Sequence, residues 1–249
     1  MYDDQILPGN VTTGVVRVGD TVRRPAGPWT ASVDALLAHL HEVGFTGAPR
    51  PLGRDEQGRQ VLEYVPGEPC DHTGTFTRPE LAEIGRLLRD LHDAAASFVP
   101  PPGARWENPI PPEGADLICH NDVAPWNLLR TARGWVLIDW DGASPASRTW
   151  DLAYAAQSMA GMRPERDPAD AAARLRAFTD GYGLDHAHGP ALAAALARRA
   201  RAMYDLLETG ARENRQPWAR IFTEDGPYWR DTAAYLDEHR ALWDAALAA

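Results

Sequence analysis

Residues 117–141 read LICHNDVAPWNLLRTARGWVLIDWD. We call this segment the decisive stretch, because its order of apolar and polar residues is the strongest indication of the fold in the sequence. An apolar segment, 117–119, runs directly into His120, Asn121 and Asp122. Gly134 then turns the chain into a second apolar segment, 135–138, that ends in Asp139 and Asp141. Short apolar runs bounded by turn residues favour buried strands. The pattern therefore predicts two strands whose ends deliver carboxylates to one place.

The polar residues of this stretch have the spacing that phosphoryl transfer requires. Such enzymes position a hydroxyl nucleophile with one carboxylate and hold the polyphosphate through magnesium with a second carboxylate and an amide oxygen. His120 to Asn127 has the His-x-Asp-x-x-x-x-Asn spacing of a kinase catalytic loop, and Asp139 stands where the metal-binding Asp follows. We expect Asp122 to orient the acceptor hydroxyl, and Asn127 and Asp139 to ligate Mg²⁺. The alternative is a polar cluster that only caps a hairpin.

The chain resembles a known family at these residues. His-x-Asp-x-x-x-x-Asn, Ile-Asp-Trp-Asp at 138–141 and Asp-Leu-Ala at 151–153 are similar to the aminoglycoside phosphotransferase-like kinases, which are small-molecule relatives of the protein kinases. The resemblance implies a two-lobed α+β fold of the protein-kinase type. Residues 1–66 would form a small β-rich nucleotide-binding lobe, and residues 67–249 a larger, mainly helical lobe with the catalytic and substrate-binding residues. ATP would bind in the cleft between them.

The same resemblance assigns the nucleotide site. Arg24 stands where the family usually has a phosphate-binding Lys, and an Arg also binds phosphate, with a planar fork in place of a point charge. Glu63, Tyr64 and Val65 occupy the hinge, whose backbone groups would bind the base of ATP or GTP. Gly9 to Gly14, in the first predicted hairpin, is the candidate phosphate loop. Mg²⁺ is the expected metal.

Three predicted helices surround this site. Residues 30–43 have apolar side chains at helical spacing, with Thr30 or Ser32 as N-cap. The resemblance implies that an acid of this helix pairs with the phosphate-binding cation; Asp34 is the better placed candidate and Glu42 the alternative. A second amphipathic helix covers 79–98 and carries His92, which we interpret as a core residue. Asp151 opens a third helix, either as its N-cap or, as the resemblance implies, as a brace for the catalytic loop.

The chain from Pro168 onward is predicted to be helical, with breaks at 181–190, 210–217 and Gly226 and a terminal helix over 235–247. Arg198, Arg199 and Arg201 are expected to face outward from the helix over 191–210. In the family this half builds the acceptor pocket. The acidic candidates for contact with an amine-bearing acceptor are Asp141, Asp205 and Glu208, with Glu224 and Asp225 as further options; a solvated acidic face is the alternative.

Composition limits the possible functions. The 249 residues include 44% hydrophobic and 24% charged side chains, as in globular proteins. The net charge of −10 argues against a nucleic-acid partner and is compatible with a cationic small-molecule substrate. The sequence has two cysteines, Cys70 and Cys119, neither in a Cys-x-x-Cys pair, and shows no signal or membrane segment; these features predict a cytoplasmic protein with no membrane partner. Oligomeric state cannot be read from the sequence.

The sequence therefore predicts an ATP- and Mg²⁺-dependent O-phosphotransferase that acts on a small hydroxylated cation such as an aminoglycoside-like antibiotic, with a role in antibiotic resistance. One alternative is a nucleotide- or ligand-binding module with a kinase fold and little turnover, acting in immunity or regulation. Another is a kinase of a metabolite amino alcohol.

Overall fold

The computed structural model describes residues 5–7, 14–70 and 75–248. Its N-terminal part is built on an antiparallel sheet in the order β1-β2-β3-β5-β4. The strands are β1 (Gln5–Ile6), β2 (Val16–Val18), β3 (Thr21–Arg24), β4 (Pro51–Arg54) and β5 (Gln60–Glu63). Gly19 adopts a φ of 60° in the turn between β2 and β3, a backbone conformation that glycine tolerates, so the predicted hairpin is confirmed. Of the candidate phosphate loop, all but Gly14 lies outside the described residues.

One helix, α1 (Thr30–Glu42), accompanies this sheet. Its apolar stripe is fully buried, with Leu36, Leu37 and Leu40 at 0% exposure. The predicted caps are wrong, because the N-cap position is Trp29 and has no side-chain hydrogen bond. The Thr30 hydroxyl instead accepts a hydrogen bond from the backbone N–H of Gly27, in the loop before the helix. The Ser32 hydroxyl accepts one from the backbone N–H of Arg105, in a distant loop.

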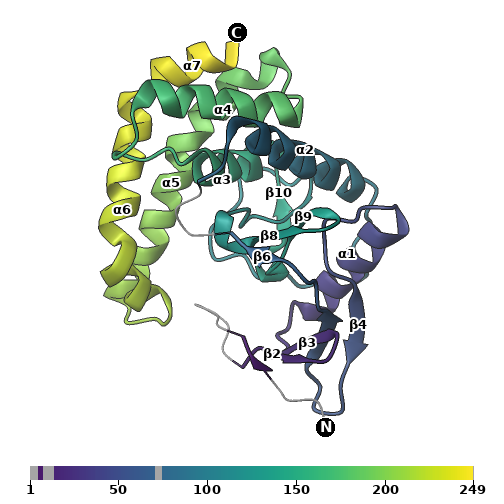
Figure 1. Cartoon of the computed structure of the whole chain (residues 1–249). Coiled ribbons are helices and arrows are strands. Elements are labelled where there is room, and N and C mark those ends of the chain that lie inside the picture. The colour runs from purple at the N-terminus through teal and green to yellow at the C-terminus, as the bar shows by residue number, and fades with distance from the viewer. Residues whose placement is uncertain (1–4, 8–13, 71–74, 249) are drawn as a thin grey trace.

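Two short sheets in the centre of the molecule carry the decisive stretch. One pairs β7 (Leu117–Cys119) with β10 (Ser144–Ala146). The other has the order β6-β8-β9, with β6 (Glu68–Pro69), β8 (Leu128–Thr131) and β9 (Gly134–Leu137). Two short 3-10 turns complete the region, η1 (Pro125–Asn127) before β8 and η2 (Trp140–Gly142) after β9. Figure 1 shows these strands between the N-terminal sheet and the helices.

The remaining elements are helical: α2 (Arg78–Ala95), α3 (Arg148–Ala160), α4 (Pro168–Tyr182), the 3-10 turn η3 (His186–His188), α5 (Gly189–Arg212), α6 (Trp218–Glu238) and α7 (Arg240–Ala248). The predicted break at Gly226 is wrong, since α6 continues through Gly226 and Pro227. The predicted terminal helix is also divided, at His239, between α6 and α7. Within the described residues, none of the helices combines the length and apolar composition that crossing a bilayer requires.

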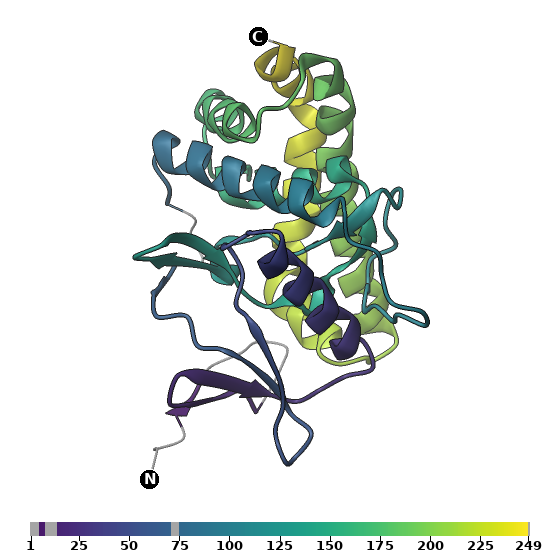
Figure 2. The same ribbon diagram turned by 90° about the vertical axis from the view of Figure 1, so that its right-hand side faces the viewer.

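Glycines bring α2 and α4 into close contact. A Cβ atom at Gly85 would collide with the carbonyl oxygen of Phe178, and one at Gly181 with that of Ala82. The two helices can therefore approach backbone to backbone, and a continuous apolar core extends from α1 through α2 to α7. Figure 2 shows α2 lying across the molecule between α1 and the C-terminal helices. The α+β class predicted from the sequence is confirmed by this arrangement.

Candidate active site

Asp122 and Asn127 lie together in the loop between β7 and β8. The side-chain Nδ2 of Asn127 donates to the backbone oxygen of Asp122 at 3.0 Å and to its Oδ2 at 2.8 Å. The two bonds fix the Asn127 amide so that its nitrogen faces the loop and its oxygen faces away from it. These two hydrogen bonds therefore orient both the Asp122 carboxylate and the Asn127 amide oxygen.

The loop is shaped by Asn121, which has a left-handed φ of 63°. Asn is one of the few residues besides glycine that adopts this conformation readily, and hydrogen bonds hold it here. The Asn121 N–H donates to Oδ1 of Asp151 at 2.8 Å, and its Nδ2 donates to the backbone oxygens of Gly142 and Ser144, both at 3.2 Å. His120 adds a contact of 3.1 Å from its Nε2 to the backbone oxygen of Ile138.

Asp151 connects the loop to the helices through a buried chain. Its Oδ2 lies 3.0 Å from Nε2 of His92, whose Nδ1 lies 2.8 Å from the hydroxyl of Tyr182. Burial raises the pKa of the Asp151 carboxyl, but the hydrogen bond and charge of His92 outweigh it and hold that pKa below its ordinary value. Helix α3 is capped by Ser147, so the N-cap interpretation of Asp151 is wrong and the bracing interpretation is confirmed. His92 is a core residue, as predicted.

Asp139 lies against the end of β3 and also has a left-handed φ, of 59°. Its Oδ1 accepts a hydrogen bond from Nη2 of Arg24 at 3.2 Å, and the same nitrogen contacts Oδ2 of Asp141. Trp29 donates from Nε1 to Oδ1 of Asp141 at 3.0 Å. Asp141, a candidate acceptor contact, is therefore engaged with the N-terminal part of the chain.

The expected ion pair between Arg24 and the acid on α1 is wrong. Asp34 accepts a hydrogen bond from Nε2 of Gln60 at 2.6 Å and lies 3.5 Å from Nη2 of Arg54. Arg54 and Gln60 pair across β4 and β5, which explains why both reach the same carboxylate. Arg24 instead forms ion pairs with Asp139 and Asp141.

The side-chain oxygens of Asn127 and Asp139 are of the kind that Mg²⁺ binds. The ion prefers oxygen ligands, and Asn127 presents an amide oxygen while Asp139, with 42% of its side chain exposed, presents a carboxylate. Because Asn127 Nδ2 is committed to Asp122, its oxygen is the atom available to a metal. A bound Mg²⁺ would neutralise charge on a polyphosphate and help to align it.

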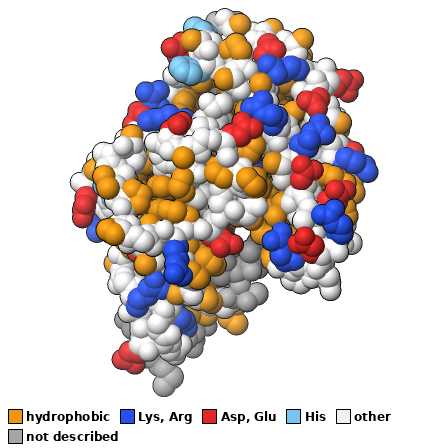
Figure 3. All heavy atoms as spheres, turned by 180° about the vertical axis from the view of Figure 1, so that it is seen from behind, with side chains coloured by type: hydrophobic (Ala, Val, Ile, Leu, Met, Phe, Trp, Pro, Cys, Tyr) orange, Lys and Arg blue, Asp and Glu red, His pale blue; other side chains and the backbone are white. Residues whose placement is uncertain are grey.

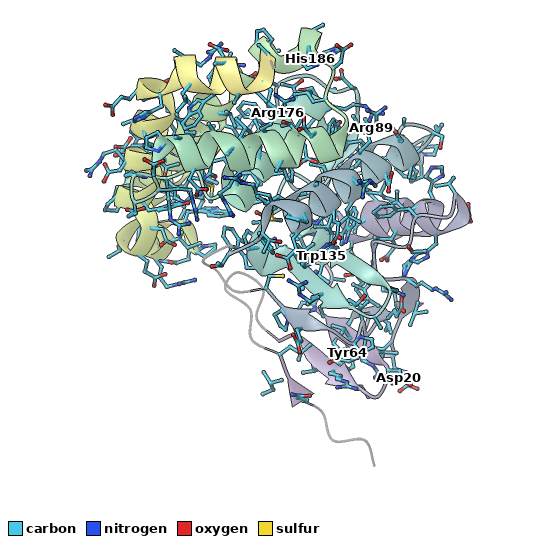
Figure 4. The ribbon with its side chains drawn as sticks, turned by 45° about the horizontal axis from the view of Figure 1, so that its top comes forward. Asp20, Tyr64, Arg89, Trp135, Arg176 and His186 are labelled. Atoms are coloured by element: carbon cyan, nitrogen blue, oxygen red, sulfur yellow. The ribbon has the colours of Figure 1, made fainter. Side chains whose placement is uncertain are left out.

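The residues expected to form the hinge, Glu63, Tyr64 and Val65, lie at and just after the end of β5. The Glu63 N–H donates to the backbone oxygen of Arg50 and the Tyr64 N–H to that of Asp20, both at 2.9 Å. Figure 4 shows Asp20 and Tyr64 beside each other at the small sheet. Among the backbone hydrogen bonds of the described residues, none uses the Val65 N–H as donor.

Asp205 and Glu208 lie on the outer side of α5. They follow Arg199 by six and nine residues, which places them about 120° and 180° around the helix from it. Both are exposed, and Glu208 accepts a hydrogen bond from the hydroxyl of Tyr204 at 2.9 Å. Glu224 and Asp225 are also exposed. Figure 3 shows acidic and basic side chains interspersed over the helical part of the rear face. The structure does not bring Asp205 or Glu208 to Asp122.

Two residues that contact the catalytic loop, Tyr154 and Arg199, were not predicted from the sequence. Tyr154 is 2% exposed, and its hydroxyl interacts with the Asp122 carboxylate and lowers the pKa of that group. Arg199, predicted to face outward, is 4% exposed and donates from Nη2 to the backbone oxygen of Asn121 at 3.1 Å. That prediction is wrong.

Each missed residue had a signal in the sequence. Arg199 continues the apolar spacing of Leu192, Leu196, Met203 and Leu206 on α5, and a polar residue within such a stripe faces the core. Tyr154 lies one helical turn after Asp151 and so shares its face of α3.

The Asp122 carboxyl is surrounded by groups that affect its ionisation in opposite directions. Burial raises its pKa, and the neighbouring charge of Asp139 acts in the same direction. The charge of His120 and the hydrogen bonds from Tyr154 and Asn127 oppose the increase, and the net shift is upward. A carboxylate with a raised pKa is a better proton acceptor, which suits a group that orients or deprotonates a hydroxyl.

Comparison with known proteins places this fold and site in a class. The model of the phosphotransferase enzyme family matches residues 103–189, which include β7, the catalytic loop, Asp139 and Asp151. The trifolitoxin immunity protein of Rhizobium leguminosarum bv. trifolii is 37% identical over 199 residues, covering 74% of this chain and 76% of that protein. The chain belongs to the phosphotransferase enzyme family.

Solved structures agree on the fold. A choline/ethanolamine kinase family protein from Mesorhizobium loti superposes with a TM-score of 0.66 at 17% identity, covering 99% of this chain and 92% of its own. The amicoumacin kinase bound to AMP-PNP, Ca²⁺ and its ligand superposes with a TM-score of 0.70 at 13% identity, covering 94% and 88%. The two-lobed, protein-kinase-like α+β fold predicted from the sequence is confirmed.

Proposed function

We propose that this protein is an ATP- and Mg²⁺-dependent O-phosphotransferase that acts on a small hydroxylated cation, with an aminoglycoside-like antibiotic as the leading acceptor class. The observation that carries the proposal is the Asp122–Asn127 contact of 2.8 Å, beside an Asp139 that faces Arg24 across the cleft. In the proposal, residues 1–66 bind the nucleotide and residues 67–249 supply the catalytic and acceptor groups.

Asp122 is the residue assigned to the acceptor. Its carboxylate would take the proton of the hydroxyl as that oxygen bonds to the terminal phosphorus, while the bond from phosphorus to the bridging oxygen breaks and the nucleoside diphosphate leaves. Asn127 holds the carboxylate through a hydrogen bond, and the Tyr154 hydroxyl interacts with it from α3. Asn127 and Asp139 would hold the metal.

The nucleotide would be bound from the N-terminal part. Arg24 is placed to exchange its contacts with Asp139 and Asp141 for the phosphates, because a guanidinium binds phosphate oxygens as readily as carboxylates. The Val65 N–H and the backbone oxygen of Glu63 would bind the base edge, and Tyr64, whose ring lies 3.7 Å from Cζ of Arg17, would border it. Backbone contacts of this kind leave ATP and GTP both possible.

The acceptor class rests on the relatives and on charge. The solved relatives include a choline/ethanolamine kinase family protein and an amicoumacin kinase, so an amino alcohol is the alternative acceptor. The net charge of −10 favours a cation in either case. Asp141 remains the acidic candidate nearest to the nucleotide site, whereas Asp205 and Glu208 would need an acceptor that reaches the outer side of α5.

A second function is favoured by the relative that is 37% identical, a trifolitoxin immunity protein. In that alternative the kinase fold binds a nucleotide or a toxic ligand with little turnover. The contacts of Arg24 with the two acids are compatible with it, since they occupy groups that a metal–nucleotide complex needs.

Calorimetric titration with ATP and GTP, with and without Mg²⁺, followed by a transfer screen over aminoglycosides and amino alcohols, tests these functions. The proposal expects Mg²⁺-dependent nucleotide binding and a phosphorylated product with one acceptor class. Nucleotide binding without transfer to any acceptor would favour the immunity alternative. If neither nucleotide binds, the proposed function is wrong.

A further inference from the structure

The carbonyl of Asn121 is held by a cation that the proposed chemistry does not use. Arg199 reaches this oxygen from α5, at 3.1 Å, while Asp151 holds the N–H of the same residue from α3, at 2.8 Å. Asn121 is therefore clamped on both sides of its left-handed backbone. It directly precedes Asp122, so its φ and ψ set the direction in which the Asp122 side chain leaves the loop.

The surroundings of Arg199 are unusual for a structural arginine. The side chain is 4% exposed, and it forms no ion pair with any carboxylate in the part of the chain that the structure describes. Its Nε and Nη1 have no hydrogen-bond partner among those residues. A buried charge normally costs stability unless it is paired, and burial lowers the pKa of this guanidinium. Simple packing would favour an apolar residue at this position.

Aromatic rings and distant carboxylates compensate the charge. Cζ of Arg199 lies 4.4 Å from the ring centroid of Tyr154 and 5.6 Å from that of Trp150, within the range of cation–π attraction. The Tyr154 hydroxyl in turn interacts with the Asp122 carboxylate, and it stays protonated because burial raises its pKa well above the ordinary value. The negative charges of Asp122 and Asp151 also act on Arg199. The guanidinium thus contacts both the backbone before Asp122 and the ring that holds its carboxylate.

From these contacts we infer that Arg199 is a positioning residue for phosphoryl transfer, which fixes the Asp122 carboxylate by clamping the Asn121 carbonyl and supporting the Tyr154 ring. The inference rests on the proposed function and deepens it. It means that the C-terminal half, through α5, contributes to the transfer step as well as to acceptor binding. The proposed nucleotide contacts of Arg24 and Val65 lie on other elements, so nucleotide binding measured without Mg²⁺ should not depend on Arg199.

Substitution of Arg199 separates this role from packing. Arg199→Met keeps the length and removes the fork, Arg199→Lys keeps the charge but provides only a point donor, and Tyr154→Phe removes only the hydroxyl. Arg198→Met is the matched control, because Arg198 is the exposed neighbour on α5 that pairs with Glu113. Misplacement of a reacting group by about 1 Å costs on the order of 100-fold in rate.

We expect Arg199→Met to lower kcat by about 100-fold with KM for nucleotide and acceptor unchanged. Arg199→Lys should retain an intermediate kcat, Tyr154→Phe should lower kcat without a change in nucleotide Kd, and Arg198→Met should match the wild type. A folded Arg199→Met with the wild-type kcat would overturn the inference. So would a loss in nucleotide affinity as large as the loss in kcat.

A different measurement applies if the wild type phosphorylates no acceptor, in which case the proposed function fails by itself. Amide hydrogen exchange then tests the clamp. Arg199→Met should speed exchange in peptides from residues 117–128 while peptides from α1 and β5 keep the wild-type rate. Unchanged exchange over 117–128 would show that Arg199 does not hold the loop and would overturn the inference.

Discussion

Nη2 of Arg24 lies 3.2 Å from Oδ1 of Asp139, a residue 115 positions later in the chain. The contact joins the end of β3 to residues 139–141 of the decisive stretch, and the same nitrogen also contacts Asp141. A metal–nucleotide complex that uses Asp139 must compete with this guanidinium. The acid that a metal needs is therefore already matched by a positive charge, which keeps two neighbouring carboxylates from repelling each other.

Asp139→Asn should abolish the Mg²⁺ dependence of nucleotide binding. The change keeps the size of the side chain but removes the charge that the divalent ion requires. Titration calorimetry with ATP, with and without Mg²⁺, measures the effect. Glu208→Gln is the control, since Glu208 is exposed on the outer side of α5, and it should bind as the wild type does. An Asp139→Asn protein that still binds more tightly with Mg²⁺ would remove Asp139 from the metal site.

Asp122→Asn should bind nucleotide normally and lose transfer by a factor of about 100 to 10,000, the usual contribution of a positioned proton acceptor. The amide has the shape of the carboxylate and can still contact Asn127, but it cannot accept the hydroxyl proton. Single-turnover transfer from labelled ATP, beside calorimetry, checks both parts. Transfer at the wild-type rate would assign the proton to another group.

Asp151→Asn should lower the free energy of unfolding by roughly 3 kcal/mol, because it leaves His92 and the Asn121 N–H without their buried charged acceptor. Denaturant unfolding followed by circular dichroism measures the loss. Asp93→Asn is a suitable control: that carboxylate is exposed and pairs at the surface with Arg89 and Arg148, where ion pairs contribute little. Equal stability of the Asp151 and Asp93 variants would contradict the brace.

The same carboxylate gives a prediction for pH. Its pKa in the folded protein is below the ordinary value, so the folded state favours the ionised form. The stabilisation is complete above the pKa of the unfolded chain, about 3.9, and is lost as pH falls below that value through the folded pKa. The stability difference between wild type and Asp151→Asn should be constant from pH 7 to about 5 and shrink below about 4. Unfolding curves across this range test it, and a difference that grows with acid would reverse the assigned sign.

Gly85→Ala should destabilise the protein, although alanine is the better helix former by about 1 kcal/mol. The added methyl would collide with the carbonyl oxygen of Phe178 and force α2 away from α4. Overpacking of this kind costs about 1–3 kcal/mol, so the net effect should be a lower melting temperature. Gly58→Ala tests the opposite limit, since nothing lies within 4 Å of its Cβ position and only its positive φ of 74° opposes the change. A Gly85→Ala protein that melts higher than wild type would show that the helices can separate freely.

The local sequence pattern was enough to predict the strands and the polar loop of the decisive stretch. The strand ends, the Asp122–Asn127 spacing and the amphipathic α2 follow from residues close together in the sequence, and such contacts depend on strand and helix periodicity alone. The caps of α1 and the continuity of α6 were harder to predict. Thr30 and Ser32 accept hydrogen bonds from other parts of the chain, and α6 continues through Gly226 and Pro227 despite their low helix propensity.

The class of this protein and the residues around its catalytic loop can be read from the sequence, because a catalytic motif places a few polar side chains at short, regular spacing. Which cation faces which acid depends on how distant elements pack. Arg24 meets Asp139 in place of Asp34, and Arg199 faces the loop in place of solvent. These contacts join residues about 80 to 115 positions apart, and their partners depend on how β3, α5 and the loop pack together, which the spacing of residues within any one element does not specify.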